Sequence, residues 1–144
     1  MPKTVEKVEL FLSKHHLLSL ATSAGNVPQS ASLFYAYDAE KVAFVVASDT
    51  KTEHIQNVLA NDHVSGTVAL ETDEVGKIEG IQFRARMRMI THKEGELYFK
   101  AFPFAKVMNP QLWSIELEEI KLTDNRLGFG KKLYWQRKNA EELE

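Results

Sequence analysis

Hydrophobic residues along the chain recur mostly at the two-residue period of strands. At residues 42–47 the apolar run is unbroken and rich in β-branched and aromatic side chains, which is typical of a strand buried on both faces. At residues 81–89 apolar and polar residues alternate, which predicts a strand with one buried face. Shorter patterns of these kinds predict strands at residues 17–22, 31–37, 64–70, 112–122 and 132–136.

Three other segments have helical spacing. Apolar residues recur on one face of residues 5–12, and Thr4 stands where a helix cap would lie. Thr50 and Glu53 have the spacing of a capping box ahead of further apolar residues, so a second helix is expected to begin at Thr50. A third, short helix is expected at residues 94–101.

Short turns between the strands predict an antiparallel fold. Gly25-Asn26 is a tight-turn signal, and the strands at 17–22, 31–37 and 42–47 are expected to form a meander. The pattern gives six or seven strands and no alternation of strands with helices. We therefore expect a mainly β fold, a small antiparallel β-barrel with peripheral helices, because closure removes exposed strand edges. Residues 1–138 are expected to form one domain, and 139–144 a polar C-terminal tail.

The polar face of the alternating strand carries a row of positive charge. The row consists of Arg84, Arg86 and Arg88. Two interpretations are open. The arginines form ion pairs with the acidic turn at residues 71–77, or they face an anion or a partner subunit.

Composition excludes several classes of function. The chain has 144 residues, a formal net charge of -2 and no cysteine. The charge argues against nucleic-acid binding driven by bulk positive charge. The lack of cysteine excludes disulfides and thiolate chemistry and is compatible with a reducing cytoplasm. No apolar run approaches the roughly 20 residues of a membrane span, and the first ten residues do not resemble a signal peptide.

Candidate chemistry lies where the buried strand meets the second helix. Ser48 and Thr50 supply hydroxyl groups there and Lys51 supplies a positive charge, next to the free N–H groups of a helix start. This combination suits a phosphate monoester. The alternative is structural: Thr50 caps the helix, Ser48 ends the strand and Lys51 is solvated. No metal site is expected, because His15 and His16 are adjacent and point in different directions.

Longer segments resemble a known superfamily. The stretches HHLLSLATSAGNVPQSASLFYAYD, KVAFVVASDTK and NDHVSGTVA resemble the split barrel of pyridoxamine 5'-phosphate oxidase-like FMN-binding proteins. The stretches GIQFRARMR and LWSIELEEIKLTDNRLGFGKKLYW are similar to the YhbP group of that superfamily. The resemblance covers about residues 5–137.

The resemblance implies a homodimer with FMN in clefts between the subunits. It implies that strand-end hydroxyls and a lysine hold the flavin phosphate, and that the second strand offers backbone groups to the ring. It also implies a tryptophan from the C-terminal strands of the partner. At the strand where the family often has arginine and glycine, this chain has Gln82 and Ala85. The implied cofactor residues are Ser48, Thr50, Lys51, Gln82, Ser32, Leu33, Phe34, Trp113 and Trp135.

Three functions follow from this resemblance. The first is an FMN-binding, oxidoreductase-like flavoprotein of unknown substrate, in which the cofactor carries the chemistry and no residue acts as a catalytic acid, base or nucleophile. The second is a haem-binding split barrel, for which five histidines offer axial ligands. The third is a cofactor-free interaction scaffold with an apolar inter-subunit cleft lined by Trp113 and Phe34. Pyridoxamine phosphate is not carried over as substrate, because no matching arginine and histidine pair lies near the C-terminus.

Overall fold

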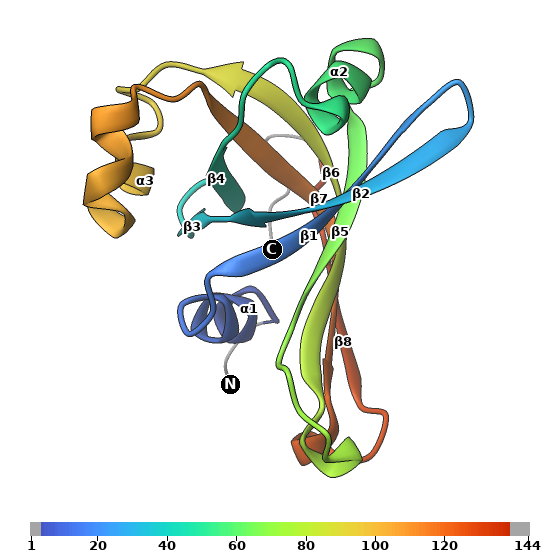
Figure 1. Cartoon of the computed structure of the whole chain (residues 1–144). Helices are drawn as coiled ribbons and strands as arrows, with labels where there is room; N and C mark the ends of the chain where they lie inside the picture. The colour runs from blue at the N-terminus through green and yellow to red at the C-terminus, as the bar shows by residue number, and fades with distance from the viewer. Residues whose placement is uncertain (1–3, 139–144) are drawn as a thin grey trace.

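A computed structural model describes residues 4–138, which form one curled antiparallel sheet with helices around it (Figure 1). The helices are α1 (Thr4–Leu12), α2 (Glu53–Ala60) and α3 (Glu96–Ala101), with 3-10 turns η1 (Val75–Lys77), η2 (Pro103–Met108) and η3 (Asn125–Leu127). The eight described strands are β1 (Leu17–Ala24), β2 (Val27–Phe34), β3 (Ala36–Asp38), β4 (Ala43–Ala47), β5 (His63–Ala69), β6 (Glu79–Ile90), β7 (Leu112–Asp124) and β8 (Lys132–Gln136). The polar tail expected at 139–144 lies outside the described residues.

The strand order confirms the expected antiparallel barrel. Neighbouring strands follow the order β2-β1-β5-β6-β7-β4-β3, and β8 adds to β7. β2 and β3 therefore stand at opposite ends of the order, although only Tyr35 separates them in the chain. One chain segment thus supplies both edges, and the sheet curls until these edges approach each other. The strand expected at 31–37 is divided here in two, which is one reason why the structure has eight strands instead of six or seven.

The hairpin between β1 and β2 was correctly predicted. Gly25 and Asn26 both have positive φ, at 58° and 63°, as the tight two-residue hairpin turn requires. The register then sets Ala24 opposite Val27 and Leu17 opposite Phe34. The turn signal thus fixes which residues of β2 face outward along the whole strand.

The start of α2 differs from the prediction. Thr52, and not Thr50, is the N-cap: its hydroxyl oxygen accepts a hydrogen bond from the backbone N–H of Ile55 at 3.4 Å. The backbone N–H of Thr52 donates to the carbonyl of Asp49 at 3.1 Å, which makes an extra turn before the helix. This turn uses up residues 49–52, so the helix begins two residues later than a cap at Thr50 would place it.

The barrel interior is filled by large apolar side chains. They come from the strands and from the inner face of α1, and include Leu20, Phe44, Phe83, Ile115, Leu117, Phe11 and Trp113. Each is almost fully buried. Among residues 4–138, no helix is both long enough and apolar enough to cross a membrane.

The arginines of β6 pair across the sheet and not with the acidic turn. The register sets Arg84 opposite Glu119, and their charged groups lie 2.8 Å apart. Arg88 contacts Glu116 at 3.2 Å, and Arg86 lies 3.8 Å from both Asp62 and Glu118. All these groups are substantially exposed, so each pair contributes little to stability. The prediction of pairing with residues 71–77 is therefore wrong, because β7 places glutamates directly beside the arginines.

We predict that Gly66→Ala destabilises the fold. A Cβ at Gly66 would lie 2.2 Å from the carbonyl oxygen of Ser19 and 2.6 Å from the ring of Phe83, so the neighbouring strand has to shift. The expected loss in unfolding free energy is about 1–3 kcal/mol, measured by denaturant unfolding. Gly76→Ala is the matched control, because nothing lies within 4 Å of its Cβ position. Equal stability of the two variants would contradict this packing.

Candidate functional site

Hydrogen bonds to residues at the start of β7 hold the junction between β4 and α2 in place. The backbone N–H of Ser48 donates to the carbonyl of Gln111 at 3.0 Å. The indole Nε1 of Trp113 donates to the carbonyl of Ser48, also at 3.0 Å. Both main-chain groups of Ser48 are therefore fixed by residues at the start of β7, so its side chain has a defined position where the buried strand ends.

His54, on the first turn of α2, contacts the hydroxyl groups of this junction. Its Nε2 lies 2.6 Å from Oγ of Ser48 and 3.3 Å from Oγ1 of Thr52. The side chain of His54 is only 8% exposed, and burial lowers the pKa of its imidazole below the usual 6.5. His54 is therefore neutral at pH 7. Sequence reasoning missed this residue, although its place beside Ile55 on the apolar side of the helix was a usable signal.

Lys51 carries the free positive charge of the junction. It is exposed, and among residues 4–138 no carboxylate lies within 4.0 Å of its ammonium group. Its backbone N–H donates to the carboxylate of Asp49 at 2.8 Å. One of the N–H groups ahead of α2 thus already has an anionic partner from the protein itself.

The second strand runs beside this junction with one edge open. Among the described strands β2 pairs only with β1, while it also passes close to β4. An unpaired strand edge carries N–H and C=O groups without ladder partners. Ser32 and Phe34 point outward, and Phe34 is 57% exposed with its ring 5.7 Å from that of Phe102. Leu33 points inward and packs against the core.

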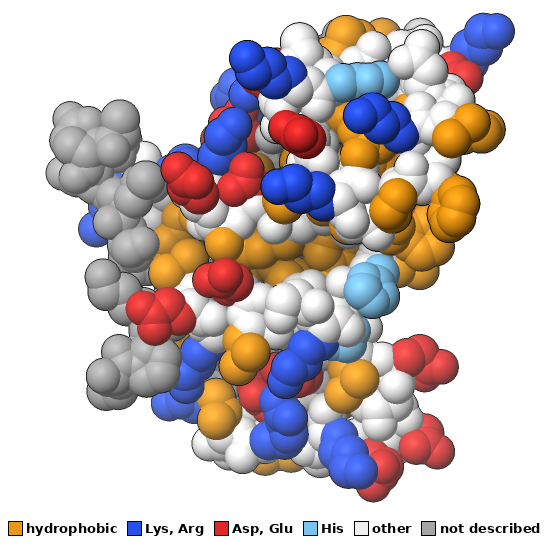
Figure 2. Space-filling model, turned by 90° about the vertical axis from the view of Figure 1, so that its left-hand side faces the viewer, with side chains coloured by type: hydrophobic (Ala, Val, Ile, Leu, Met, Phe, Trp, Pro, Cys, Tyr) orange, Lys and Arg blue, Asp and Glu red, His pale blue; other side chains and the backbone are white. Residues whose placement is uncertain are grey.

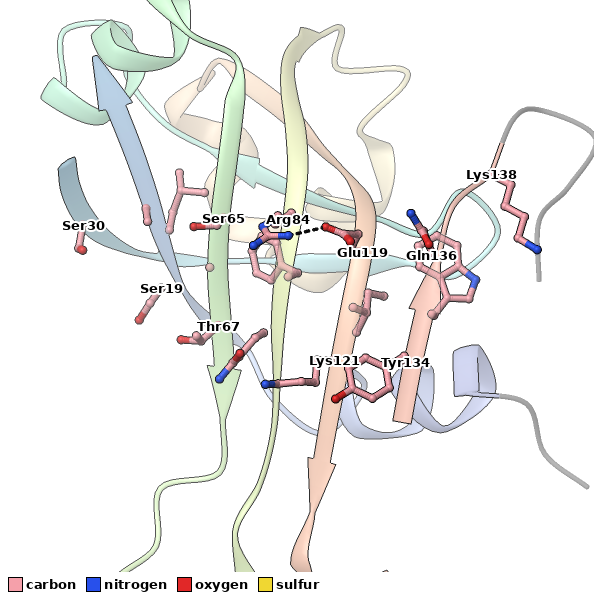
Figure 3. A pocket seen from close by; sticks show the side chains of 17 residues that line it. Ser19, Ser30, Ser65, Thr67, Arg84, Glu119, Lys121, Tyr134, Gln136 and Lys138 are labelled. Atoms are coloured by element: carbon pink, nitrogen blue, oxygen red, sulfur yellow. Dashed lines mark hydrogen bonds and ion pairs between the residues drawn. The ribbon is translucent and has the colours of Figure 1, made fainter. Parts of the chain in front are cut away.

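A broad cleft of about 870 Å³ lies on the outer face of the sheet (Figure 3). Arg84 and Glu119 form an ion pair in its middle, and Lys121 extends from β7 toward Thr67 on β5. Small hydroxyl side chains line the side formed by β1 and β5, and Tyr134 stands at the opposite side on β8. The register aligns these groups in rows across the strands: Ser19, Thr67, Gln82, Lys121 and Tyr134 in one, and Ser65, Arg84, Glu119 and Gln136 in the next.

The structure brings only some of the expected cofactor residues together. Ser48, Thr50 and Lys51 share the junction, and Ser32, Leu33 and Phe34 lie on the neighbouring strand. Gln82 lies elsewhere: it pairs with Lys121, which is ten residues from Gln111, the partner of Ser48, or roughly 30 Å at about 3.3 Å per residue.

The two expected tryptophans lie inside the molecule. Trp113 is 1% exposed and packs in the barrel core, so its ring is out of reach of a ligand outside the barrel. Trp135 is 2% exposed, but it borders the outer cleft, and its buried Nε1 has no hydrogen-bond partner among the described residues. Both tryptophan rings are therefore buried in the core, and a ligand in the cleft does not reach either of them.

A second, smaller hollow of about 370 Å³ lies between α1 and α3. Figure 2 shows apolar side chains gathered between an upper and a lower charged region on this side of the molecule. His15 and His16 line the hollow together with Tyr37 and Lys100. Within residues 4–138, no three histidine or carboxylate side chains gather in a way that could hold a metal ion.

Two sequence relatives match nearly the whole chain. A UPF0306 protein of Serratia proteamaculans is 40% identical over 136 residues, which cover 92% of this chain and 94% of that protein. The UPF0306 protein YhbP of Escherichia fergusonii is 36% identical over 144 residues, covering 97% and 98%. No protein-family model matches the chain.

Solved structures share the fold at low sequence identity. A haem-binding protein from Mycobacterium smegmatis has a TM-score of 0.78 at 14% identity, covering 94% of this chain and 59% of that one. A NimC/NimA family protein from Clostridium acetobutylicum has a TM-score of 0.71 at 15% identity, covering 92% of both chains. A FAD-binding protein from Mesorhizobium loti has a TM-score of 0.67 at 16% identity, covering 79% and 87%. These matches confirm the split-barrel fold.

We predict that His54 makes the folded state less stable in acid. Because its pKa is lower in the folded than in the unfolded chain, the unfolded chain binds the proton more readily. The contribution of His54 to the free energy of unfolding is therefore fully present above the unfolded pKa of about 6.5, and it is lost as the pH drops below that value. Unfolding free energies measured from about pH 7.5 to 5 should fall less steeply in His54→Gln than in the wild type. Parallel curves would show that His54 does not titrate in this way.

Proposed function

This chain belongs to the UPF0306 family, and we propose that it is a flavoprotein that holds FMN where β4, α2 and the open edge of β2 meet. The observation that carries the proposal is this meeting itself. A split between β2 and β4 sets unpaired backbone groups beside two hydroxyls, a free lysine and a helix start. This combination suits an anionic ligand whose ring carries hydrogen-bonding atoms.

The phosphate of FMN would lie at the β4–α2 junction. Ser48, Thr50 and Lys51 offer two hydroxyls and an ammonium group, and the first N–H groups of α2 add partial positive charge. Hydrogen bonds between a charged donor and a phosphate are roughly twice as strong as neutral ones. Lys51 is therefore the strongest single contact in this part of the proposed site.

The flavin ring would lie along β2. Its edge carries hydrogen-bonding atoms that match the backbone groups of an unpaired strand edge, here those of Ser32 and Phe34. The exposed ring of Phe34 adds an apolar surface at the end of this edge. Leu33 takes no part, because its backbone groups face Leu18 on β1 and its side chain packs inward.

One observation at the junction tests whether FMN fits. The Asp49 carboxylate accepts a hydrogen bond from the backbone N–H of Lys51 at 2.8 Å. Asp49 is exposed and can turn toward solvent, so the residues fit the phosphate once this one hydrogen bond is given up.

Gln82 could contribute to the proposed FMN site only from a second copy of the chain. It lies in the outer cleft, too far along the barrel to join Lys51 in one protomer. We therefore propose a homodimer in which the cleft face of one protomer covers the junction of its partner. Gln82 would then reach the flavin from the cleft face, whereas the buried ring of Trp135 would not.

Bound FMN would supply hydride transfer, and the chain's own residues would bind and orient it. The junction fixes the phosphate end, β2 fixes the ring plane, and the partner's cleft face excludes water from the ring. We assign no catalytic acid or base among the described residues, and the substrate stays open.

Haem binding is the second candidate function. It is favoured by the two histidines that line the hollow between α1 and α3 and by the fold shared with a haem-binding protein. Titration with haem followed by a Soret band would distinguish it from flavin binding. A folded protein that binds neither would favour the interaction scaffold.

We predict that Lys51→Ala weakens FMN binding by about 5- to 50-fold, because a charge-assisted phosphate contact is lost. Fluorescence quenching of FMN measures the affinity. Lys77→Ala is the matched control, since it removes the same charge from a distant turn, where Lys77 pairs with Glu74 at 3.1 Å. Unchanged affinity in Lys51→Ala would remove Lys51 from the site.

We predict that the site is shared between two protomers. Lys51→Ala and Gln82→Ala should each bind FMN weakly, while an equal mixture that exchanges subunits recovers full affinity in about a quarter of its sites. Sedimentation should show a dimer at micromolar concentration. A monomer, or a mixture no better than its components, would contradict the shared site.

A further inference from the structure

His54 touches two hydroxyl groups of the junction through a single nitrogen. Its Nε2 contacts Ser48 at 2.6 Å and Thr52 at 3.3 Å. We infer that His54 is a positioning residue for the phosphate site, because its protonation decides whether the Ser48 hydroxyl hydrogen is available to the phosphate. This inference rests on the proposed function, since it concerns the same site.

The Ser48 hydroxyl has a single hydrogen to donate, either to His54 or to a bound anion. In the neutral tautomer that carries its hydrogen on Nδ1, Nε2 of His54 accepts, and the Ser48 hydroxyl donates its hydrogen inward. A phosphate at the junction then receives nothing from Ser48. When His54 is protonated, Nε2 donates to Oγ of Ser48 instead. The Ser48 hydrogen is then free to point outward, toward an anion.

Thr52 cannot take over this role. Its hydroxyl hydrogen is already donated to the carbonyl of Asp49 at 2.8 Å, and its oxygen accepts from the N–H of Ile55. Toward His54 it can therefore only accept, so this 3.3 Å contact becomes a hydrogen bond only when Nε2 carries a hydrogen. Of the two hydroxyls that touch His54, only that of Ser48 can reverse its direction.

The surroundings of His54 favour the neutral form until an anion arrives. α2 packs against β1 and β2, and neither strand contains an ionisable side chain. The charged neighbours on the junction are Asp49, Lys51 and Glu53, all exposed. Burial alone lowers the pKa of His54.

A phosphate bound next to the imidazole would favour its charged form and raise that pKa. FMN and a proton would then bind together, so the affinity for FMN increases as the pH falls. The same coupling would not arise for riboflavin, which has no phosphate group. The residue thus selects an anionic ligand in a pH-dependent way.

The experiment measures FMN affinity between about pH 5 and 8 in the wild type and in His54→Gln, whose amide donates to Ser48 at every pH. The phosphate of FMN itself titrates near a pKa of about 6, but this affects both proteins equally and cancels in the ratio of affinities. The ratio of wild-type to variant affinity should rise about three- to ten-fold from pH 8 to 5. A constant ratio would overturn the role of His54.

A second measurement needs no change at the buried histidine. Imidazole resonances of the wild type, followed by NMR, should show the pKa of His54 rising when FMN is added and not when riboflavin is added. In Ser48→Ala, FMN should raise it less. An unchanged pKa in the FMN complex would overturn the inference and leave the proposed function standing. Folded wild-type protein that binds no FMN at any pH would overturn both.

Discussion

The architecture depends on how a single antiparallel sheet closes. One chain segment supplies both of its edges, β2 and β3, and the break between them is pinned at Tyr35. The backbone N–H of Tyr35 donates to the carbonyl of His16 at 2.9 Å, and its hydroxyl donates to that of Leu12 at 2.8 Å. Because the edges approach without pairing in the described part of the chain, β2 keeps an open side next to the end of β4. The proposed ligand site is a consequence of this incomplete closure.

The hydrogen-bond donors at that opening are partly free for a ligand and partly occupied by the protein's own side chains. Lys51 offers a free charge, yet Asp49 holds a backbone N–H that an anion would also use. His54 similarly holds the hydroxyl of Ser48. The donors of this junction are thus partly occupied by its own side chains, which would limit the affinity for the proposed ligand. One short segment in this way ends a strand and begins a helix while the charge of Lys51 stays free.

Local patterns predicted most of the fold but only part of the site. The strands around Phe44 and Phe83 and the turn at Gly25-Asn26 depend on neighbouring residues, so the sequence was sufficient for them. The position of Gln82 depends on register across three strands, and the burial of Trp113 depends on the closed barrel. The partners of Arg84 and the contacts of His54 likewise join distant or unevenly spaced residues, which no local pattern encodes.

The central claim is that the junction of β4, α2 and β2 recognises the phosphate of a flavin. Calorimetric titration of the purified protein with FMN and with riboflavin compares two ligands that differ only in that group. The account predicts that FMN binds at least about ten-fold more tightly at low ionic strength, as a charge-assisted phosphate contact requires. Equal affinity for the two, or tight riboflavin binding alone, would contradict it.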